Sequence, residues 1–355
     1  MRIGILTHHY IKNYGAFLQV YALQETLKKE FPNDDVYVIN YINRKHLFVN
    51  IAGWYRFNPK KDSIKKYFQK ITIPSLFSKI EKEYLNTSKK VYNVRQVNEL
   101  NFDAIIIGSD EVWHYGDKKS YDPIKFGLDL TCKNVITYAP SMGGANINEA
   151  SNEVIEGLKN IKAFSARDDS AEEFVKKYTN KKCTRVLDPT LLYEFPEYSS
   201  KIVDRLKKER YLLMYYCDGL PDDLKKEILN YAQEHNLKIY GAGEYKKWFD
   251  DFPININPFE WIEMFRNAEV IFTGTFHGTI FSLKSQKQFF NYLSNPSRIK
   301  KVNSLLSEFK ISDRIIKDKL ESKENIDYTV INKIIEENRL RSVEYLEKSI
   351  KWKEK

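Results

Sequence analysis

The stretch MRIGILTHHYIKNYGAFLQVYALQETLK at residues 1–28 decides the fold class of this chain. Residues 2–6 are a short apolar run typical of a buried strand, and residues 16–28 place apolar side chains at helical spacing. Another apolar run, at residues 35–40, predicts the next strand. A strand, a loop, a helix and a second strand in this order begin a parallel α/β layer.

The same alternation continues along the chain in two halves. Further strands of the first half are expected at residues 102–108, 134–139, 163–167 and 184–189, with helices at 149–162 and 169–178. After a linker at 193–197, strands are expected at 211–216, 237–241 and 269–273, a loop at 274–279, and helices at 221–235, 258–267 and from 280. Two successive parallel halves predict a cleft between them, at the carboxyl ends of the strands.

This pattern predicts a first α/β domain at residues 1–195, a second at 196–320, and an amphipathic C-terminal helix at 321–355 that packs back across a domain. Residues 44–95 interrupt the first domain as an insertion of short helices. They hold 13 Lys and Arg residues against three acidic ones, whereas the net charge of the whole chain is +9. The basic character therefore belongs to this insertion and not to the fold.

Length and composition exclude several classes of protein. A chain of 355 residues with 42% hydrophobic residues is neither disordered nor a single small domain. Its three cysteines form no CxxC pair, which argues against a zinc ribbon or a disulfide scaffold. The apolar run at residues 1–6 is too short for a signal peptide, and no apolar stretch could span a bilayer. We expect a cytoplasmic protein without a metal or a cofactor.

Small and polar residues recur directly after the predicted strands, where a ligand would meet helix N-termini that favour anions. These stretches are residues 7–15, 108–113, 141–144, 165–168, 188–190 and 273–279. An N-capped turn would explain residues 108–110 equally well, and Arg167 with Asp168 could be a local ion pair. His277 lies between Gly274 and Gly278, which permit close backbone approach to a ligand. No Walker A, GxGxxG or HExxH motif is present.

Taken together, these motifs resemble the polysaccharide pyruvyl transferase family. The stretches that carry the resemblance are NYGAFLQ at 13–19, GSDEVW at 108–113, YAPSMG at 138–143, SARDDS at 165–170, VLDPT at 186–190 and FHGTIFS at 276–282. All six occur in the family's order, over about residues 3 to 314. The resemblance is specific for the family but not for an acceptor.

The resemblance implies two Rossmann-like domains that face each other across a cleft, as in GT-B glycosyltransferases. It implies transfer of a pyruvyl group from phosphoenolpyruvate, the donor substrate, onto two hydroxyls of a sugar, which forms a cyclic ketal. The acceptor would be a bacterial surface glycan precursor carried on a lipid pyrophosphate, at the inner face of the cytoplasmic membrane. Such chemistry needs an acid, a base and an anion clamp.

By resemblance, Arg167 and His277 bind the donor, with Gly278 and Thr275 beside them, and His277 takes part in proton transfer. Some relatives have an arginine where this chain has Thr275. The candidates for a substitute clamp are Arg298, Lys300 and Lys301, which could equally be a solvated turn. The general base is expected to be Asp110, with Glu111 in reserve. The residues expected at the acceptor are His8, Asn13, Tyr14, Gly15, Ser109 and Asp110.

The basic insertion has two interpretations. Each Lys or Arg near an anionic lipid surface contributes about 1 kcal/mol of attraction, so residues 44–95 could dock on acidic lipid or on a pyrophosphate. They could also form a solvated, lysine-rich surface, and no nucleic-acid-binding motif accompanies the charge. For the whole chain, the alternative functions are a glycosyltransferase that uses a nucleotide sugar and a family member that has lost catalysis.

Overall fold

The computed structural model describes residues 1–57, 64–321 and 323–351. The chain divides into two compact units, which we call unit 1 and unit 2. Unit 1 comprises Met1–Arg56, Phe77–Phe195 and Ile335–Lys355, and unit 2 comprises Phe57–Leu76 and Pro196–Ile334. Part of the basic insertion thus groups with unit 2, and the C-terminal segment contributes to both units.

Unit 1 is built on a parallel sheet with the strand order β2-β1-β3-β4-β5-β6. The strands are β1 (Arg2–Leu6), β2 (Asp35–Val38), β3 (Ala104–Asp110), β4 (Asn134–Pro140), β5 (Ile161–Ala166) and β6 (Cys183–Arg185). β3 and β4 are buried along almost their whole length, as apolar strands covered on both faces should be. Their parallel direction brings the loops after β1, β3, β4, β5 and β6 to one edge of the sheet.

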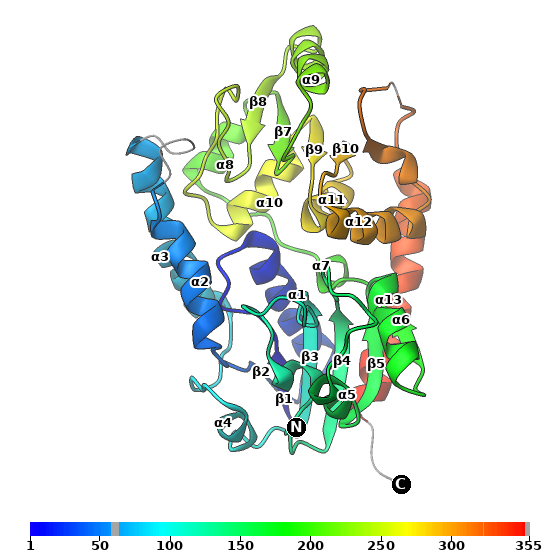
Figure 1. Ribbon diagram of the computed structural model, residues 1–355. Coiled ribbons are helices and arrows are strands. Elements are labelled where there is room, and N and C mark those ends of the chain that lie inside the picture. Colours follow the sequence, from blue (N-terminus) through cyan, green and yellow to red (C-terminus); the bar gives the residue numbers. More distant parts are fainter. Residues whose placement is uncertain (58–63, 322, 352–355) are drawn as a thin grey trace. The chain divides into compact units, whose positions relative to one another are not determined.

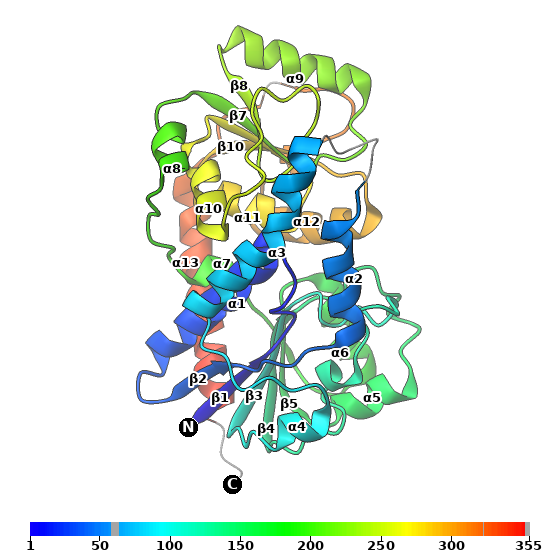
Figure 2. The ribbon, with the colours of Figure 1, turned by 90° about the vertical axis from the view of Figure 1, so that its left-hand side faces the viewer.

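Helices cover both faces of this sheet (Figure 1 and Figure 2). Helices α1 (Tyr14–Glu30) and α13 (Tyr328–Ile350) lie on one face, and α5 (Asn152–Leu158) and α6 (Asp169–Tyr178) lie on the other. The short α7 (Pro189–Leu192) and the 3-10 helix η1 (Pro123–Phe126) also belong to unit 1.

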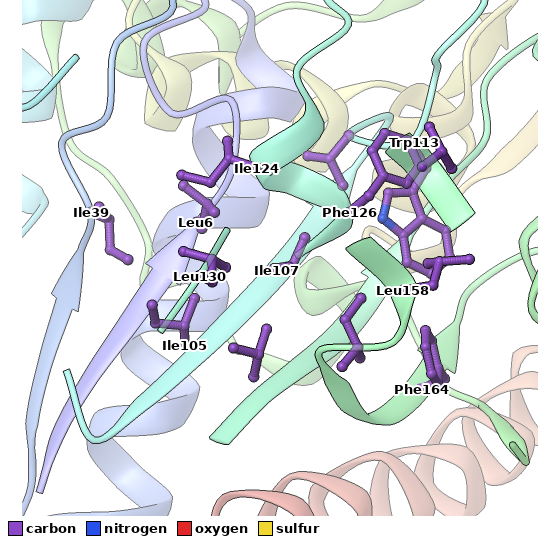
Figure 3. Close-up of a cluster of buried hydrophobic side chains, with 14 of the residues drawn as sticks. Leu6, Ile39, Ile105, Ile107, Trp113, Ile124, Phe126, Leu130, Leu158 and Phe164 are labelled. Carbon is purple, nitrogen blue, oxygen red and sulfur yellow. The ribbon is translucent and has the colours of Figure 1, made fainter. Parts of the chain in front are cut away.

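The core between the sheet and α5 and α6 is rich in aromatic rings (Figure 3). The Trp113 ring is fully buried, stacks on Phe126 at a centroid distance of 6.0 Å and lies 6.4 Å from Phe164. The indole N–H of Trp113 donates to the carbonyl oxygen of Lys125 at 2.9 Å. The loop after β3 is therefore fixed both by packing and by a buried hydrogen bond.

The end of α13 is tied to the sheet of unit 1 by polar contacts as well as by packing. The hydroxyl of Tyr345 donates to the Thr137 carbonyl oxygen at 2.8 Å, and the hydroxyl of Ser342 accepts from the backbone N–H of Leu187 at 2.9 Å. The side chain of Leu346 is completely buried. These contacts make the C-terminal helix part of the core of unit 1.

Unit 2 is a second parallel sheet, with the order β11-β10-β9-β7-β8. Its strands are β7 (Tyr211–Tyr215), β8 (Lys238–Gly241), β9 (Val270–Thr273), β10 (Gln288–Tyr292) and β11 (Ile315–Ile316). Its helices are α8 (Lys201–Leu206), α9 (Asp222–Glu234), α10 (Pro258–Asn267), α11 (Phe276–Lys284) and α12 (Pro296–Glu308), with a short 3-10 helix η2 (Ser312–Arg314). The predicted α/β class, with two successive parallel layers, is confirmed.

The basic insertion is helical, as expected, but its helices are not all short. It contains α2 (Arg44–Tyr55), α3 (Ile64–Tyr84) and α4 (Val94–Asn98), and α3 runs for 21 residues through Pro74. Lys60, Lys61 and Asp62 of the charge count lie outside the described residues. No helix in the described ranges is long and apolar enough to cross a membrane.

Several of the expected element boundaries are wrong. The strand expected at 184–189 ends at Arg185, and the C-terminal helix expected from 321 begins at Tyr328. The helix expected at 149–162 covers only Asn152–Leu158, because the Ser151 side chain caps it and the chain turns back into β5 at Ile161. The loop expected at 274–279 is already helical from Phe276, because Thr275 caps α11. His277 therefore lies in the first turn of a helix.

We predict that Leu346→Ala lowers the free energy of unfolding by about 2–5 kcal/mol, because it leaves a cavity in the core of unit 1. The matched control is Leu340→Ala on the same helix, whose side chain is 65% exposed and should change stability by less than about 0.5 kcal/mol. Urea unfolding followed by circular dichroism measures both. Equal effects of the two substitutions would show that α13 does not pack as described.

Candidate active site

In unit 1 the site begins at a buried arginine. Arg167 follows β5, and its side chain is 2% exposed. Its Nη1 donates to Asp188 Oδ2 at 2.5 Å, and its Nη2 lies 3.4 Å from Asp110 Oδ1. Burial disfavours the charged guanidinium, but Asp188 and Asp110 outweigh burial and raise the pKa of Arg167. The expected donor clamp and the expected general base are thus neighbours.

The aspartate partners come from different strand ends. Asp188 follows β6, caps α7 by accepting from the backbone N–H of Thr190 at 3.0 Å, and has a fully buried side chain. Asp110 ends β3 with a positive φ of 81° and retains a partly exposed side chain. Asp110 does not cap a helix, so the capped-turn interpretation of residues 108–110 is wrong. Its roles as base and acceptor ligand stay predictions.

Next to these groups lies a buried amine that the sequence analysis missed. The side chain of Lys125, on η1, is completely buried, and its Nζ lies 2.9 Å from Nδ1 and 3.1 Å from Nε2 of His8. Burial lowers the pKa of Lys125 to about 8, against the attraction of Asp122 and Asp110. Burial, followed by the charge of Lys125, holds the pKa of His8 well below its ordinary value.

Two further histidines lie beside His8. The His46 ring lies 4.9 Å from that of His8, and its Nδ1 is 3.2 Å from the Tyr10 hydroxyl. His9 Nε2 is 3.2 Å from Asn40 Oδ1. Burial lowers the pKa of His9 and of His46 to about 4, so both rings are neutral near pH 7. In the part of the chain that the structure describes, no three His, Cys, Asp or Glu residues group closely enough to hold a metal ion.

The expected acceptor residues of the first loop have clear local roles. Asn13 is exposed and caps α1 by accepting from the backbone N–H of Ala16 at 3.1 Å. Tyr14 and Gly15 are buried in the first turn of α1, where the Tyr14 ring packs against Phe77. The acceptor roles of these three residues stay predictions.

Ser109 and Glu111 lie on either side of Asp110. Ser109 is completely buried, and its Oγ donates to Gln19 Oε1 at 2.7 Å. Glu111 lies near Gly143, since a Cβ at residue 143 would be 2.8 Å from Glu111 Oε2 and 3.0 Å from His114 Nδ1. Gly143 therefore leaves room for the Glu111 carboxylate, which is our second candidate for the general base.

Unit 2, considered by itself, has a group of candidate site residues at the start of α11. The Thr275 Oγ1 accepts from the backbone N–H of Gly278 at 3.0 Å and thereby caps the helix. A Cβ at residue 278 would lie only 2.0 Å from Thr273 Oγ1, so only glycine fits here. Thr275 is thus a helix cap, and His277 follows it in the first turn of α11.

The three residues expected as substitute clamps lie on α12, but they differ in their contacts and in their burial. Arg298 reaches the α11 segment, because its Nη1 donates to the Gly274 carbonyl oxygen at 3.4 Å and lies 3.7 Å from Asp218 Oδ2. Lys301 is buried and Lys300 is exposed. Arg298 thus reaches the segment that leads into α11.

A second residue that the sequence analysis missed lies at the same edge of unit 2. Glu244 follows β8, and its Oε1 accepts from the backbone N–H of Tyr216 at 2.5 Å. Burial raises its pKa to about 7. The sequence did contain an indication of this residue, because Gly241-Ala242-Gly243-Glu244 is a stretch of small and polar residues after a predicted strand.

The model of the polysaccharide pyruvyl transferase family matches residues 13–297, so the expected resemblance is confirmed. No curated protein matches the chain. Among solved structures, a putative UDP-N-acetylglucosamine 2-epimerase from Listeria monocytogenes is 9% identical at a TM-score of 0.52, over 97% of this chain and 90% of that chain. This likeness supports the two-domain Rossmann-like fold.

Two further solved structures are similar at lower TM-scores. A UDP-GlcNAc 2-epimerase from Methanocaldococcus jannaschii is 12% identical at 0.48, over 95% of this chain and 92% of that chain. A heptosyltransferase from E. coli, solved with ADP, is 10% identical at 0.40, over 95% of this chain and all of that chain.

We predict that Asp188→Ala lowers the free energy of unfolding by about 3–5 kcal/mol, because it leaves the buried guanidinium of Arg167 without its closest carboxylate. The control is Asp169→Ala, which removes the exposed partner of Arg185 and should cost less than about 1 kcal/mol. Denaturant unfolding compares the two variants with the unchanged protein. An Asp188→Ala protein as stable as the control would contradict the buried pair.

Proposed function

Because this chain belongs to the polysaccharide pyruvyl transferase family and is a transferase, we propose that it moves the pyruvyl group of phosphoenolpyruvate onto two hydroxyls of a sugar. The product is a cyclic ketal in a bacterial surface polysaccharide precursor. Phosphoenolpyruvate is the donor substrate in this proposal, and no separate cofactor takes part.

The start of α11 is the observation that carries the donor assignment. Phosphoenolpyruvate presents a phosphate and a carboxylate, which bind well to helix N-terminal N–H groups, to arginine and to histidine. In unit 2, His277 lies in the first turn of α11, and the Arg298 guanidinium reaches the Gly274 carbonyl oxygen. We assign the donor to His277, Gly278 and Arg298, with Lys301 in reserve.

The reaction requires balanced movement of two protons. The C2–C3 double bond of phosphoenolpyruvate gives its electron pair to a new C3–H bond, and C2 becomes an oxocarbenium-like centre. One sugar hydroxyl oxygen bonds to C2, phosphate leaves with the electron pair of its C2–O bond, and the second hydroxyl closes the ring. One of the two hydroxyl protons accounts for the proton that C3 gains when it becomes a methyl group. The other is taken up by the released phosphate.

Unit 1 supplies the remaining proposed roles. Arg167 keeps its role as a donor ligand, and its Nη2 lies 3.4 Å from Asp110 Oδ1. Asp110 would accept a hydroxyl proton of the sugar. Glu111 is the reserve base, and His8 belongs to the acceptor side.

We also propose that the acceptor is carried on a lipid pyrophosphate and that α2 meets the membrane. This helix exposes the apolar side chains of Phe48, Val49 and Tyr55 together with the basic Arg44 and Lys45. Beside it lies a mostly apolar cavity of about 420 Å³, lined by Ile42, Arg44, Leu47, Phe48, Ile51, Lys90 and Tyr92. Exposed apolar groups with basic neighbours suit an anionic lipid surface better than a purely solvated one.

We predict that phosphoenolpyruvate raises the melting temperature of the protein, whereas pyruvate and phosphate alone do so less. A ligand at 100 times its Kd adds about 2.7 kcal/mol to the stability of the native state. Arg298→Ala, His277→Ala and Arg167→Ala should each weaken donor binding about tenfold or more, because each removes a charged or polar ligand of an anion. Thermal shift at graded donor concentrations measures this.

The matched controls for the donor experiment are Arg210→Ala, an exposed arginine of unit 2, and His235→Ala, an exposed histidine. Both should bind the donor like the unchanged protein. A shift with UDP-sugars and none with phosphoenolpyruvate would overturn the proposal in favour of a glycosyltransferase.

We predict that the protein floats with anionic vesicles and not with neutral ones. Phe48→Glu should reduce the bound fraction, because it places a negative charge where the apolar side chain is 73% exposed. The control Leu340→Glu changes a leucine on α13 whose side chain is 65% exposed, and it should leave binding unchanged. Equal binding to both vesicle types, or none, would contradict membrane docking through α2.

A further inference from the structure

Glu244 is a buried carboxyl group at the carboxyl edge of unit 2 to which the proposed function gives no role. Its side chain is only 9% exposed. Oε1 accepts from the Tyr216 backbone N–H at 2.5 Å, and Oε2 lies 3.9 Å from Lys246 Nζ. The hydrogen bond uses Oε1. The Lys246 Nζ is farther from Oε2 than the Tyr216 nitrogen is from Oε1.

A short chain of contacts connects Glu244 to the start of α11. Tyr216, whose N–H binds Glu244, directly follows β7. Its carbonyl oxygen approaches Gly274 so closely that a Cβ at residue 274 would lie 2.2 Å away. The Gly274 carbonyl oxygen in turn accepts from Arg298 Nη1. The carboxyl group and the proposed donor clamp thus flank the same segment, which leads into Thr275.

The surroundings of Glu244 favour its neutral form more strongly than those of an exposed carboxyl group would. Burial is the largest effect and raises its pKa to about 7, while Lys246 and the Tyr216 N–H lower that pKa. The charged groups that face it are Lys246, Asp218 and Arg298. Burial also raises the pKa of Tyr216 to about 12 and that of Cys217 far above its usual value, so neither ionises near pH 7.

The charge of the proposed donor decides which form of Glu244 can lie next to it. An ionised carboxylate repels a phosphate or carboxylate, and burial strengthens that repulsion. A protonated carboxyl group instead has an O–H that can donate to an anionic oxygen. The donor should therefore bind the neutral acid and shift Glu244 further towards it.

We propose that Glu244 contacts phosphoenolpyruvate as a neutral carboxylic acid, so that the donor binds together with a proton. The inference rests on the proposed function, because it takes phosphoenolpyruvate as the donor. It adds to that function a donor ligand from the β8 loop and a proton held at the donor site before the acceptor arrives. The first step of the reaction, protonation at C3, consumes one proton.

The sign of the pH dependence follows directly. Donor binding is strongest below the pKa of free Glu244, which is about 7, and weakens as the pH rises through this value. A group with this pKa is about 90% protonated at pH 6 and about 10% at pH 8, so the apparent affinity falls about tenfold between them. The phosphate of the donor titrates as well, but equally with every variant.

Isothermal titration calorimetry with phosphoenolpyruvate tests the inference. Titrations at pH 6, 7 and 8, in buffers of different ionisation enthalpy, give both the affinity and the number of protons taken up. At pH 8 the unchanged protein should take up close to one proton more than Glu244→Gln. Glu244→Gln should bind the donor and lack the tenfold loss of affinity. Glu244→Asp should retain the proton uptake.

The matched control is Glu227→Gln, because the Glu227 carboxylate in the same unit also accepts a backbone N–H, that of Leu320, at 2.5 Å. It should behave like the unchanged protein. Two results would overturn this inference but leave the proposed function standing. One is equal proton uptake by the unchanged protein and Glu244→Gln, and the other is a folded Glu244→Gln protein that binds no donor at any pH. If the unchanged protein bound no donor at all, the proposed function would fail with it.

Discussion

The buried ion pair of Arg167 with Asp188 is the constraint on which the site of unit 1 depends. It joins the carboxyl ends of β5 and β6, and the second guanidinium nitrogen reaches Asp110 at the end of β3. A buried guanidinium is costly without its carboxylates, so these three strand ends must keep their relative positions. Asp110 is consequently held beside the positive charge of Arg167.

The start of α11 plays the corresponding part in unit 2. The Thr275 cap and the close approach of Gly278 to Thr273 fix the first turn of the helix, and with it His277. Arg298 Nη1, from α12, donates to the Gly274 carbonyl oxygen just before this turn.

The sequence was sufficient to predict the parts of the site that lie next to regular strands. Each strand of a parallel sheet ends at the same edge, so Arg167 and Asp110 could be expected there together, as the structure shows. Lys125 and Glu244 were missed because their significance comes from burial by residues distant in sequence, such as His8 and Tyr216. The helical start at Phe276 was missed because glycines at 274 and 278 resemble a loop.

A crystal structure of the protein soaked with phosphoenolpyruvate would locate the donor. We expect an anionic group of the donor at the first turn of α11, within hydrogen-bond distance of the Gly278 segment or His277 and of the Arg298 guanidinium. We also expect a donor oxygen within hydrogen-bond distance of Glu244. A donor bound elsewhere on unit 2, with the start of α11 empty at saturating concentration, would contradict this expectation.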